Sequence, residues 1–92
     1  MALEKLTVYY SGRVQGVGFR YTVKSLTAGF DVTGTIKNLD DGRVKLVVEG
    51  EKQELLEFQK AIRDSGLRRF IRNEDEKWEI ADGELRGFKI VG

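Results

Sequence analysis

Residues 11–22, SGRVQGVGFRYT, join a strand pattern to a helix pattern. Before this junction, apolar and polar residues alternate over residues 6–11, which is typical of a half-buried strand. After it, Phe19, Val23 and Leu26 fall at i, i+4 and i+7, which predicts the apolar side of a helix. The junction itself holds three glycines within seven residues. The stretch therefore predicts a strand, a flexible loop and a helix in succession.

Two further strand patterns follow the first helix and predict a hairpin. Residues 32–38, VTGTIKN, read as one strand, and residues 44–50 alternate apolar and polar positions as the next. Between them, LDDG at 39–42 predicts a tight turn in which Asp41 and Gly42 supply positive φ. We expect this hairpin to lie beside the first strand.

A second helix and a less regular tail complete the chain. Residues 51–66 predict an amphipathic helix. Its apolar side comprises Leu55, Phe58 and Ile62. Scattered hydrophobic residues in the tail indicate one or two more strands, with loops expected at NEDE, residues 73–76, and at ADGELRG, residues 81–87. The order βαββαβ predicts an α+β fold, a ferredoxin-like α/β sandwich with two helices on one face of an antiparallel sheet, in a single domain over residues 1–92.

Composition narrows the classes of function. The 92 residues contain no cysteine and no histidine, which excludes disulfides, thiolate chemistry, the commonest zinc ligands and the usual general base at neutral pH. A net charge of only +1 argues against a nucleic-acid partner held mainly by charge. No apolar run suits a signal peptide or a membrane span. We expect a cytoplasmic monomer with no metal, no nucleic-acid partner and no membrane partner.

The glycine-rich junction has the composition of an anion site. A helix N-terminus carries unpaired N–H groups and partial positive charge, and glycines before it allow successive N–H groups to converge. Arg20 falls in the first turn, where a cation opposes the helix dipole by about 0.3–1 kcal/mol and a bound anion would offset that cost. Its planar fork matches phosphate oxygens. The residues alone leave open a plainer alternative, in which the glycines only turn the chain and Arg20 faces solvent or a carboxylate.

Asn38 is the second candidate for a functional residue. It ends the second predicted strand, and pairing of that strand near the first would bring its side chain toward the glycine loop. A neutral amide there can accept a hydrogen bond from a water molecule or donate one to it. The structural alternative is that the asparagine caps backbone at the start of the turn.

Two segments resemble the signatures of the acylphosphatase family. GRVQGVGFR, residues 12–20, resembles the first signature, and GTIKNLDDGRVKLVVEG, residues 34–50, resembles the second. The eighteen positions from Arg20 to Asn38 also agree with the family's spacing. The chain departs from the pattern where Thr35 and Ile36 follow a glycine, since the family usually has an aromatic and a small residue there.

This resemblance implies hydrolysis of acyl phosphates to a carboxylate and inorganic phosphate, without metal or organic cofactor. In that family the signature arginine binds the phosphate and the signature asparagine positions the attacking water. By matching position these residues are Arg20 and Asn38. The resemblance also implies a phosphate cradle formed by the backbone N–H groups of Gln15, Gly16, Val17, Gly18, Phe19 and Arg20.

Two other functions remain as alternatives at this point. An RNA-binding module on a similar sheet would stack bases on aromatic side chains of its open face. The expected open face of the third strand carries no aromatic residue and comprises Arg43, Lys45, Val47 and Glu49. A non-catalytic anion-binding domain would share Arg20 and differ only at Asn38. A basic patch at residues 68–72 is interpreted as solvated surface.

Overall fold

The computed structural model describes residues 3–92, so residues 1–2 of the predicted domain lie outside the described residues. Its helices are α1 (Phe19–Leu26) and α2 (Lys52–Asp64), and short 3-10 turns occur at η1 (Thr27–Gly29) and η2 (Arg68–Phe70). Its strands are β1 (Glu4–Gly12), β2 (Thr33–Asn38), β3 (Val44–Gly50), β4 (Ile71–Ile80) and β5 (Phe88–Ile90).

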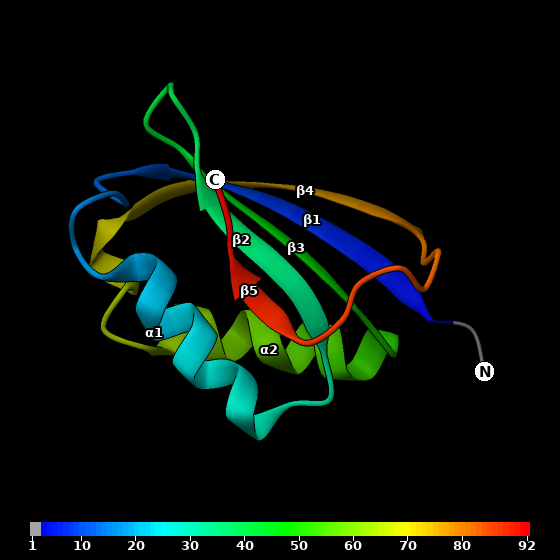
Figure 1. Cartoon of the computed structure of the whole chain (residues 1–92). Coiled ribbons are helices and arrows are strands. Elements are labelled where there is room, and N and C mark those ends of the chain that lie inside the picture. The colour runs from blue at the N-terminus through cyan, green and yellow to red at the C-terminus, as the bar shows by residue number, and fades with distance from the viewer. Residues whose placement is uncertain (1–2) are drawn as a thin grey trace.

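The strands form one sheet in the order β4-β1-β3-β2-β5, and both helices pack on one face of it (Figure 1). The pairings of β1 with β3, β1 with β4 and β2 with β3 are antiparallel. The ferredoxin-like fold class expected from the sequence is confirmed. The sheet is mixed rather than wholly antiparallel, because the short strand β5 runs parallel to β2 at the edge.

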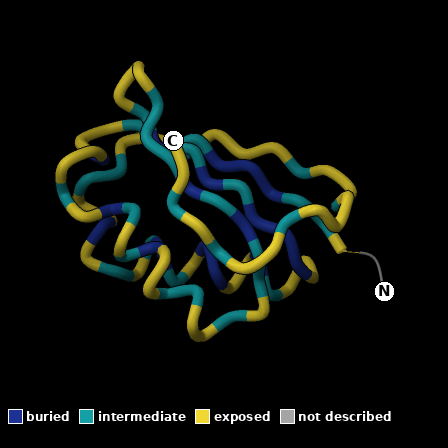
Figure 2. Tube along the Cα trace, in the orientation of Figure 1, coloured by how far each residue is buried: buried dark blue, intermediate teal, exposed yellow. Residues whose placement is uncertain are grey.

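The core lies between the sheet and the helices. Alternate residues of the central strands point toward the helices, and Figure 2 shows these strands as a mixture of buried and intermediate residues while most of the surrounding loops are exposed. Fully buried hydrophobic side chains from both layers include Leu6, Val8, Ile36, Leu46, Val48, Leu55, Phe58 and Ile62. Phe58 of α2 also meets Phe30 and Phe88 edge-to-face, which joins the second helix to the chain around β2 and β5. The residues predicted to form the apolar sides of the strands and helices therefore form the core.

The β2–β3 turn follows the sequence prediction with one correction. Gly42 adopts φ +94°, as expected, but Asp41 does not adopt positive φ. The N–H of Leu39 donates to the carbonyl of Arg43 at 2.8 Å, and the N–H of Gly42 donates to the carbonyl of Leu39 at 3.2 Å. The Asp41 carboxylate instead accepts from the N–H of Arg43 at 3.1 Å. This aspartate closes the turn as a side-chain acceptor.

The prediction of a loop at residues 73–76 is wrong, because these residues lie in the middle of β4. Glu74 and Glu76 sit opposite the inward-facing Tyr10 and Val8 of β1, so their side chains lie on the helix side of the sheet. Arg63 of α2 binds Glu74 at 3.0 Å. Gln59 of α2 donates to Glu76 at 2.8 Å. These partners on α2 satisfy polar positions that would otherwise contradict a strand.

A β-bulge joins the end of β1 to the start of β4. Ser11 pairs with Asn73 but Gly12 pairs with Ile71, so Arg72 has no opposite residue on β1. Gly12 adopts φ +127°, and a Cβ built on it would lie 2.3 Å from the carbonyl oxygen of Phe70. This close approach fixes the point at which the chain leaves the sheet for the glycine loop.

Substituting Gly12→Ala is expected to destabilise the fold by about 2–4 kcal/mol, because the new methyl group meets backbone in a strained conformation. Urea unfolding followed by circular dichroism measures the loss. Gly29→Ala is the matched control, because no atom lies within 4 Å of a Cβ at that position. Equal stability of the two variants would contradict the tight junction between β1 and β4.

Candidate active site

Four strand ends meet at one end of the sheet, where the glycine loop leaves it. The register pairs Tyr10 of β1 with Val44 of β3, and Val44 with Asn38 of β2. On the other side of β1, Gly12 pairs with Ile71 of β4. Residues 13–18 run from this end of β1 to the N-terminus of α1. The fold thus brings the two signature segments to the same end of the sheet.

The loop enters α1 through two glycines in the left-handed conformation. Gly16 has φ +77° and Gly18, at the N-cap of α1, has φ +78°. An L-residue with a side chain pays roughly 1–2 kcal/mol for that conformation. No side chain caps the helix at Gly18. The glycines therefore give the loop a backbone path that leaves the helix N-terminus uncapped.

The six backbone N–H groups from Gln15 to Arg20 donate no hydrogen bond to any described residue. The first N–H of this region with a backbone acceptor is that of Thr22, which donates to the carbonyl of Gly18 at 3.0 Å. Unpaired N–H groups in succession at a helix N-terminus favour a bound anion. These six groups are those that the family resemblance assigns to a phosphate cradle.

Apolar side chains anchor the same loop to the hydrophobic core. Val14 and Phe19 are almost fully buried, and Val17 packs against the core from the middle of the loop. The Phe19 ring lies 5.0 Å from the Tyr10 ring of β1, centroid to centroid. Burial raises the pKa of Tyr10, which keeps its hydroxyl neutral in this apolar contact. The loop is therefore anchored by its side chains, while the N–H groups of residues 15–20 have no partner among the described residues.

Arg20 is half-buried in the first turn of α1, and its guanidinium has no ion pair or hydrogen bond with residues 3–92. Arg43, by contrast, contacts Asp41 at 2.8 Å and lies 4.7 Å from the centre of the Tyr9 ring. The N–H of Arg43, followed by its guanidinium, holds the pKa of Asp41 below its ordinary value. Asp41 is thus engaged with Arg43, and the guanidinium of Arg20 has no carboxylate partner among residues 3–92.

Asn38 is the last residue of β2 and shares the helix-facing side of that strand with Gly34 and Ile36. Its Oδ1 atom is buried and accepts no hydrogen bond from the described residues. Because an unsatisfied buried acceptor costs roughly 1–3 kcal/mol, a donor from outside the described residues, such as a water molecule, would be favoured at this oxygen. The structural alternative was that Asn38 caps backbone at the start of the turn. Its Oδ1 accepts no backbone N–H there, so this atom does not act as a cap.

Gln15 ties the glycine loop to the residues beside Asn38. Its Nε2 donates to the carbonyl of Leu39 at 2.8 Å and to the carbonyl of Arg43 at 2.9 Å. The sequence predicted a role only for the backbone N–H of Gln15. The signal in the sequence for a role of this side chain was that Gln15 lies within the first signature. Its two partner carbonyls are 24 and 28 residues away in the chain, so no local pattern predicts these hydrogen bonds. This side chain sets the spacing between the two halves of the site.

Neither a metal cluster nor a membrane helix accompanies this site in the described part of the chain. No group of three or more acidic residues within residues 3–92 is placed to hold a metal ion. No helix among these residues has the length and apolar character needed to cross a bilayer. The candidate groups at this end of the sheet are the backbone N–H groups of residues 15–20, the guanidinium of Arg20 and the amide of Asn38.

The structure thus places an uncapped, arginine-bearing helix N-terminus at one end of a ferredoxin-like α/β sandwich, in a chain without a histidine. The family model described as Acylphosphatase matches residues 6–90. The chain belongs to the acylphosphatase family and is a hydrolase that acts on acyl phosphates.

Similar proteins agree over nearly the whole chain. An acylphosphatase of Clostridium acetobutylicum is 41% identical over 92 residues, covering 97% of this chain and 98% of that protein. An acylphosphatase of Roseiflexus sp. (strain RS-1) is 35% identical, covering 99% and 98%. The crystal structure of acylphosphatase from Bacillus subtilis superimposes with a TM-score of 0.87 at 30% identity, covering 97% of this chain and 99% of that one.

Replacing Gln15→Ala is expected to lower kcat/KM for an acyl phosphate about 10-fold and stability by about 1–2 kcal/mol. Two hydrogen bonds between the loop and the β2–β3 turn are lost, each worth about 1 kcal/mol, and the loop is held less firmly. Steady-state kinetics and urea unfolding measure the two effects. Gln53→Ala is the control, because Gln53 bonds only an exposed glutamate on α2. If activity is unchanged in Gln15→Ala, the glutamine does not set the spacing of the site.

Proposed function

We propose that the chain hydrolyses acyl phosphates without a metal ion, holding the phosphate between the N–H groups of residues 15–20 and the guanidinium of Arg20. The observation that carries this proposal is the set of six unpaired N–H groups beside an unpaired arginine. Together they supply a fixed ring of donors and one permanent positive charge. Preorganised hydrogen-bond donors around the phosphate oxygens stabilise the negative charge that develops during phosphoryl transfer.

Asn38 is proposed to position the attacking water. Its buried Oδ1 has no donor among the described residues and is therefore able to accept a hydrogen bond from a water O–H. Gln15 holds the glycine loop against Leu39, the next residue in the chain, so the water would lie near the bound phosphate. A glutamine amide orients water in the same way in some GTPases.

The proposed reaction needs no histidine. The water oxygen forms a bond to phosphorus while the bond from phosphorus to the acyl oxygen breaks, and the carboxylate leaves with the electron pair. A carboxylate is a good leaving group, so no general acid is required, and a phosphate oxygen takes the water's proton. A pH–rate profile that requires an enzymic base near neutrality would contradict this proton transfer.

The partners proposed for the chain are small acyl phosphates and the inorganic phosphate that they release. For the RNA-binding alternative, the aromatic residue of β1 on the open face is Tyr9, and two cationic side chains lie over its ring. Arg43 lies 4.7 Å and Lys45 lies 5.8 Å from its ring centre.

Four expectations stay predictions from the sequence. They are a monomeric state, a cytoplasmic location, the single domain over residues 1–92 and the absence of membrane partners.

Metal-independent turnover tests the proposal. The wild-type chain is expected to hydrolyse benzoyl phosphate at the same rate with excess EDTA as without it. The reason is that Arg20 and the N–H groups, and not a metal ion, would stabilise the negative charge on the transferring phosphoryl group. Loss of absorbance of the acyl phosphate measures the rate, and a heat-denatured sample is the control. If EDTA removes the activity and Mg²⁺ restores it, the proposed charge stabilisation is insufficient. If no turnover occurs but phosphate binds, the site is a binding domain.

A further inference from the structure

A basic groove lies beside the glycine loop, on its β4 side. Its volume is about 140 Å³, and its walls are Gly12, Arg13, Arg69, Phe70, Ile71 and Arg72. Three of these six residues are arginines and none is acidic. The chain as a whole carries a net charge of only +1, so this concentration of one sign is not a general property of its surface.

The arginines of the groove lack protein partners. Within residues 3–92, the guanidinium groups of Arg13, Arg69 and Arg72 have no ion pair and no hydrogen bond. Arg63, which lies nearby on α2, is bound by Glu74 at 3.0 Å. Glu74 and Glu76 of the edge strand are thus engaged with α2, and no acidic residue lines the groove.

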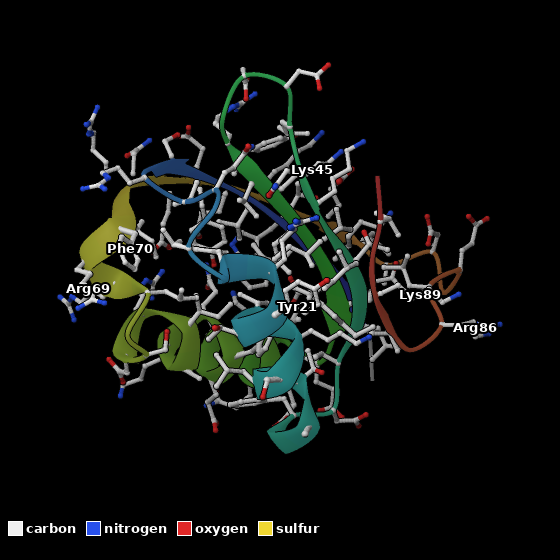
Figure 3. The ribbon with its side chains drawn as sticks, turned by 60° about the vertical axis from the view of Figure 1, so that its left-hand side comes forward. Tyr21, Lys45, Arg69, Phe70, Arg86 and Lys89 are labelled. Atoms are coloured by element: carbon white, nitrogen blue, oxygen red, sulfur yellow. The ribbon has the colours of Figure 1, made fainter. Side chains whose placement is uncertain are left out.

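The groove is held in shape by backbone contacts. The N–H of Arg13 donates to the carbonyl of Phe70 at 3.0 Å, and the absence of a side chain at Gly12 allows the two segments to meet. The Arg69 guanidinium lies 4.8 Å from the centre of the Phe70 ring. Arg72 is the unpaired residue of the β-bulge, a position at which strands redirect a side chain. Figure 3 shows Arg69 and Phe70 together at one end of the molecule, with Arg86 at the opposite end.

The groove and the cradle are two parts of one stretch of chain. Arg13 precedes Gln15 by two residues, so their Cα atoms are at most about 7 Å apart. The wall of the groove at Arg13 and the start of the cradle at Gln15 are therefore neighbouring parts of the same loop. The interpretation of residues 68–72 as solvated surface does not explain why the positive charge gathers at this place.

We propose that this groove, named here the arginine groove, binds a second anionic group carried by the acyl part of the substrate. Substrates would then be acyl phosphates with a carboxylate or phosphate away from the reacting bond. Arginine forks suit both groups, and exposed cations also raise the rate of encounter with a dianion. The inference rests on the proposed function, because the cradle must hold the reacting phosphate.

The test compares two rigid substrates, 4-carboxybenzoyl phosphate and 4-methylbenzoyl phosphate, which differ in charge at the far end. The readout is the ratio of their kcat/KM values in the wild type, in Arg69→Gln and Arg72→Gln, and in the double variant. The ratio is expected to fall about 5-fold in each single variant and further in the double variant, since an exposed ion pair contributes up to about 5-fold. The matched control Arg86→Gln, at the opposite end of the molecule, should keep the wild-type ratio.

Ionic strength supplies a second readout. The ratio of the two kcat/KM values should decline with added salt in the wild type, because salt screens the ion pairs, and should not change with added salt in the double variant. 3-Carboxybenzoyl phosphate and 4-(phosphonomethyl)benzoyl phosphate show which geometry and which anion the groove prefers. Hydrolysis of all substrates with a ratio unchanged by the variants overturns the inference and leaves the proposed function standing. Absence of turnover with every substrate overturns the proposed function, and this inference with it.

Discussion

Asn38→Ala is expected to reduce kcat for benzoyl phosphate by about 100- to 1000-fold, the usual loss when one preorganised polar group is removed from a reacting centre. Binding of inorganic phosphate should be almost unchanged, because the cradle and Arg20 remain. Steady-state hydrolysis and calorimetric titration with phosphate measure the two quantities separately. A large loss in turnover without a loss in phosphate affinity assigns the asparagine to the water.

The same variant has an expected effect on stability that separates catalysis from folding. The side chain of Asn38 makes no hydrogen bond with the described residues, so its removal breaks no hydrogen bond within the protein. The alanine variant should therefore unfold at about the same urea concentration as the wild type. Asn73→Ala, at an exposed asparagine on β4, is the matched control for both measurements. Full activity in Asn38→Ala would refute its assigned role.

Arg20→Ala is expected to weaken phosphate binding about 100-fold or more and to lower kcat/KM by about 1000-fold. Two charge-assisted hydrogen bonds to phosphate contribute about 3 kcal/mol to binding, and an arginine at a transferring phosphoryl group contributes about 10³-fold or more to turnover. The phosphate-induced rise in the unfolding temperature should disappear in this variant. Without phosphate, the variant should be slightly more stable, by about 0.5 kcal/mol, since Arg20 opposes the dipole of α1.

A graded series sharpens this prediction. Arg20→Lys keeps the charge but loses the planar fork, so its activity and phosphate affinity should fall between those of the wild type and Arg20→Ala. Arg86→Ala, on the loop before β5, controls for the loss of one exposed positive charge. If Arg20→Ala binds phosphate as tightly as Arg86→Ala does, the guanidinium plays no part in the cradle.

Most of the architecture could be predicted from local patterns. Alternation in β1 and β3 and the apolar side of α2 each lie within one short segment, and each predicts the face that is buried. The two signatures placed Arg20 and Asn38 on neighbouring elements, and the sheet register brings those elements to one end of the sheet. The predictions of the strands and of α2 succeeded because sequence and structure share a period there.

The remaining features depend on contacts between distant segments. The strand at residues 73–76 looked like a loop because its carboxylates find Arg63 and Gln59 only after α2 packs beneath the sheet. The parallel pairing of β5 with β2 joins residues about fifty positions apart, for which no local pattern exists. The arginine groove likewise arises only when the bulge at Gly12 brings Arg13 beside η2.

The site of bond cleavage is the most direct test of a phosphate held in the cradle and attacked by water. Benzoyl phosphate is hydrolysed by the wild-type chain in ¹⁸O-labelled water with EDTA, and both products are analysed by mass spectrometry. The account predicts that the label enters inorganic phosphate, because water attacks phosphorus and the carboxylate leaves. Label found in benzoate instead would mean attack at the acyl carbon and would contradict the account.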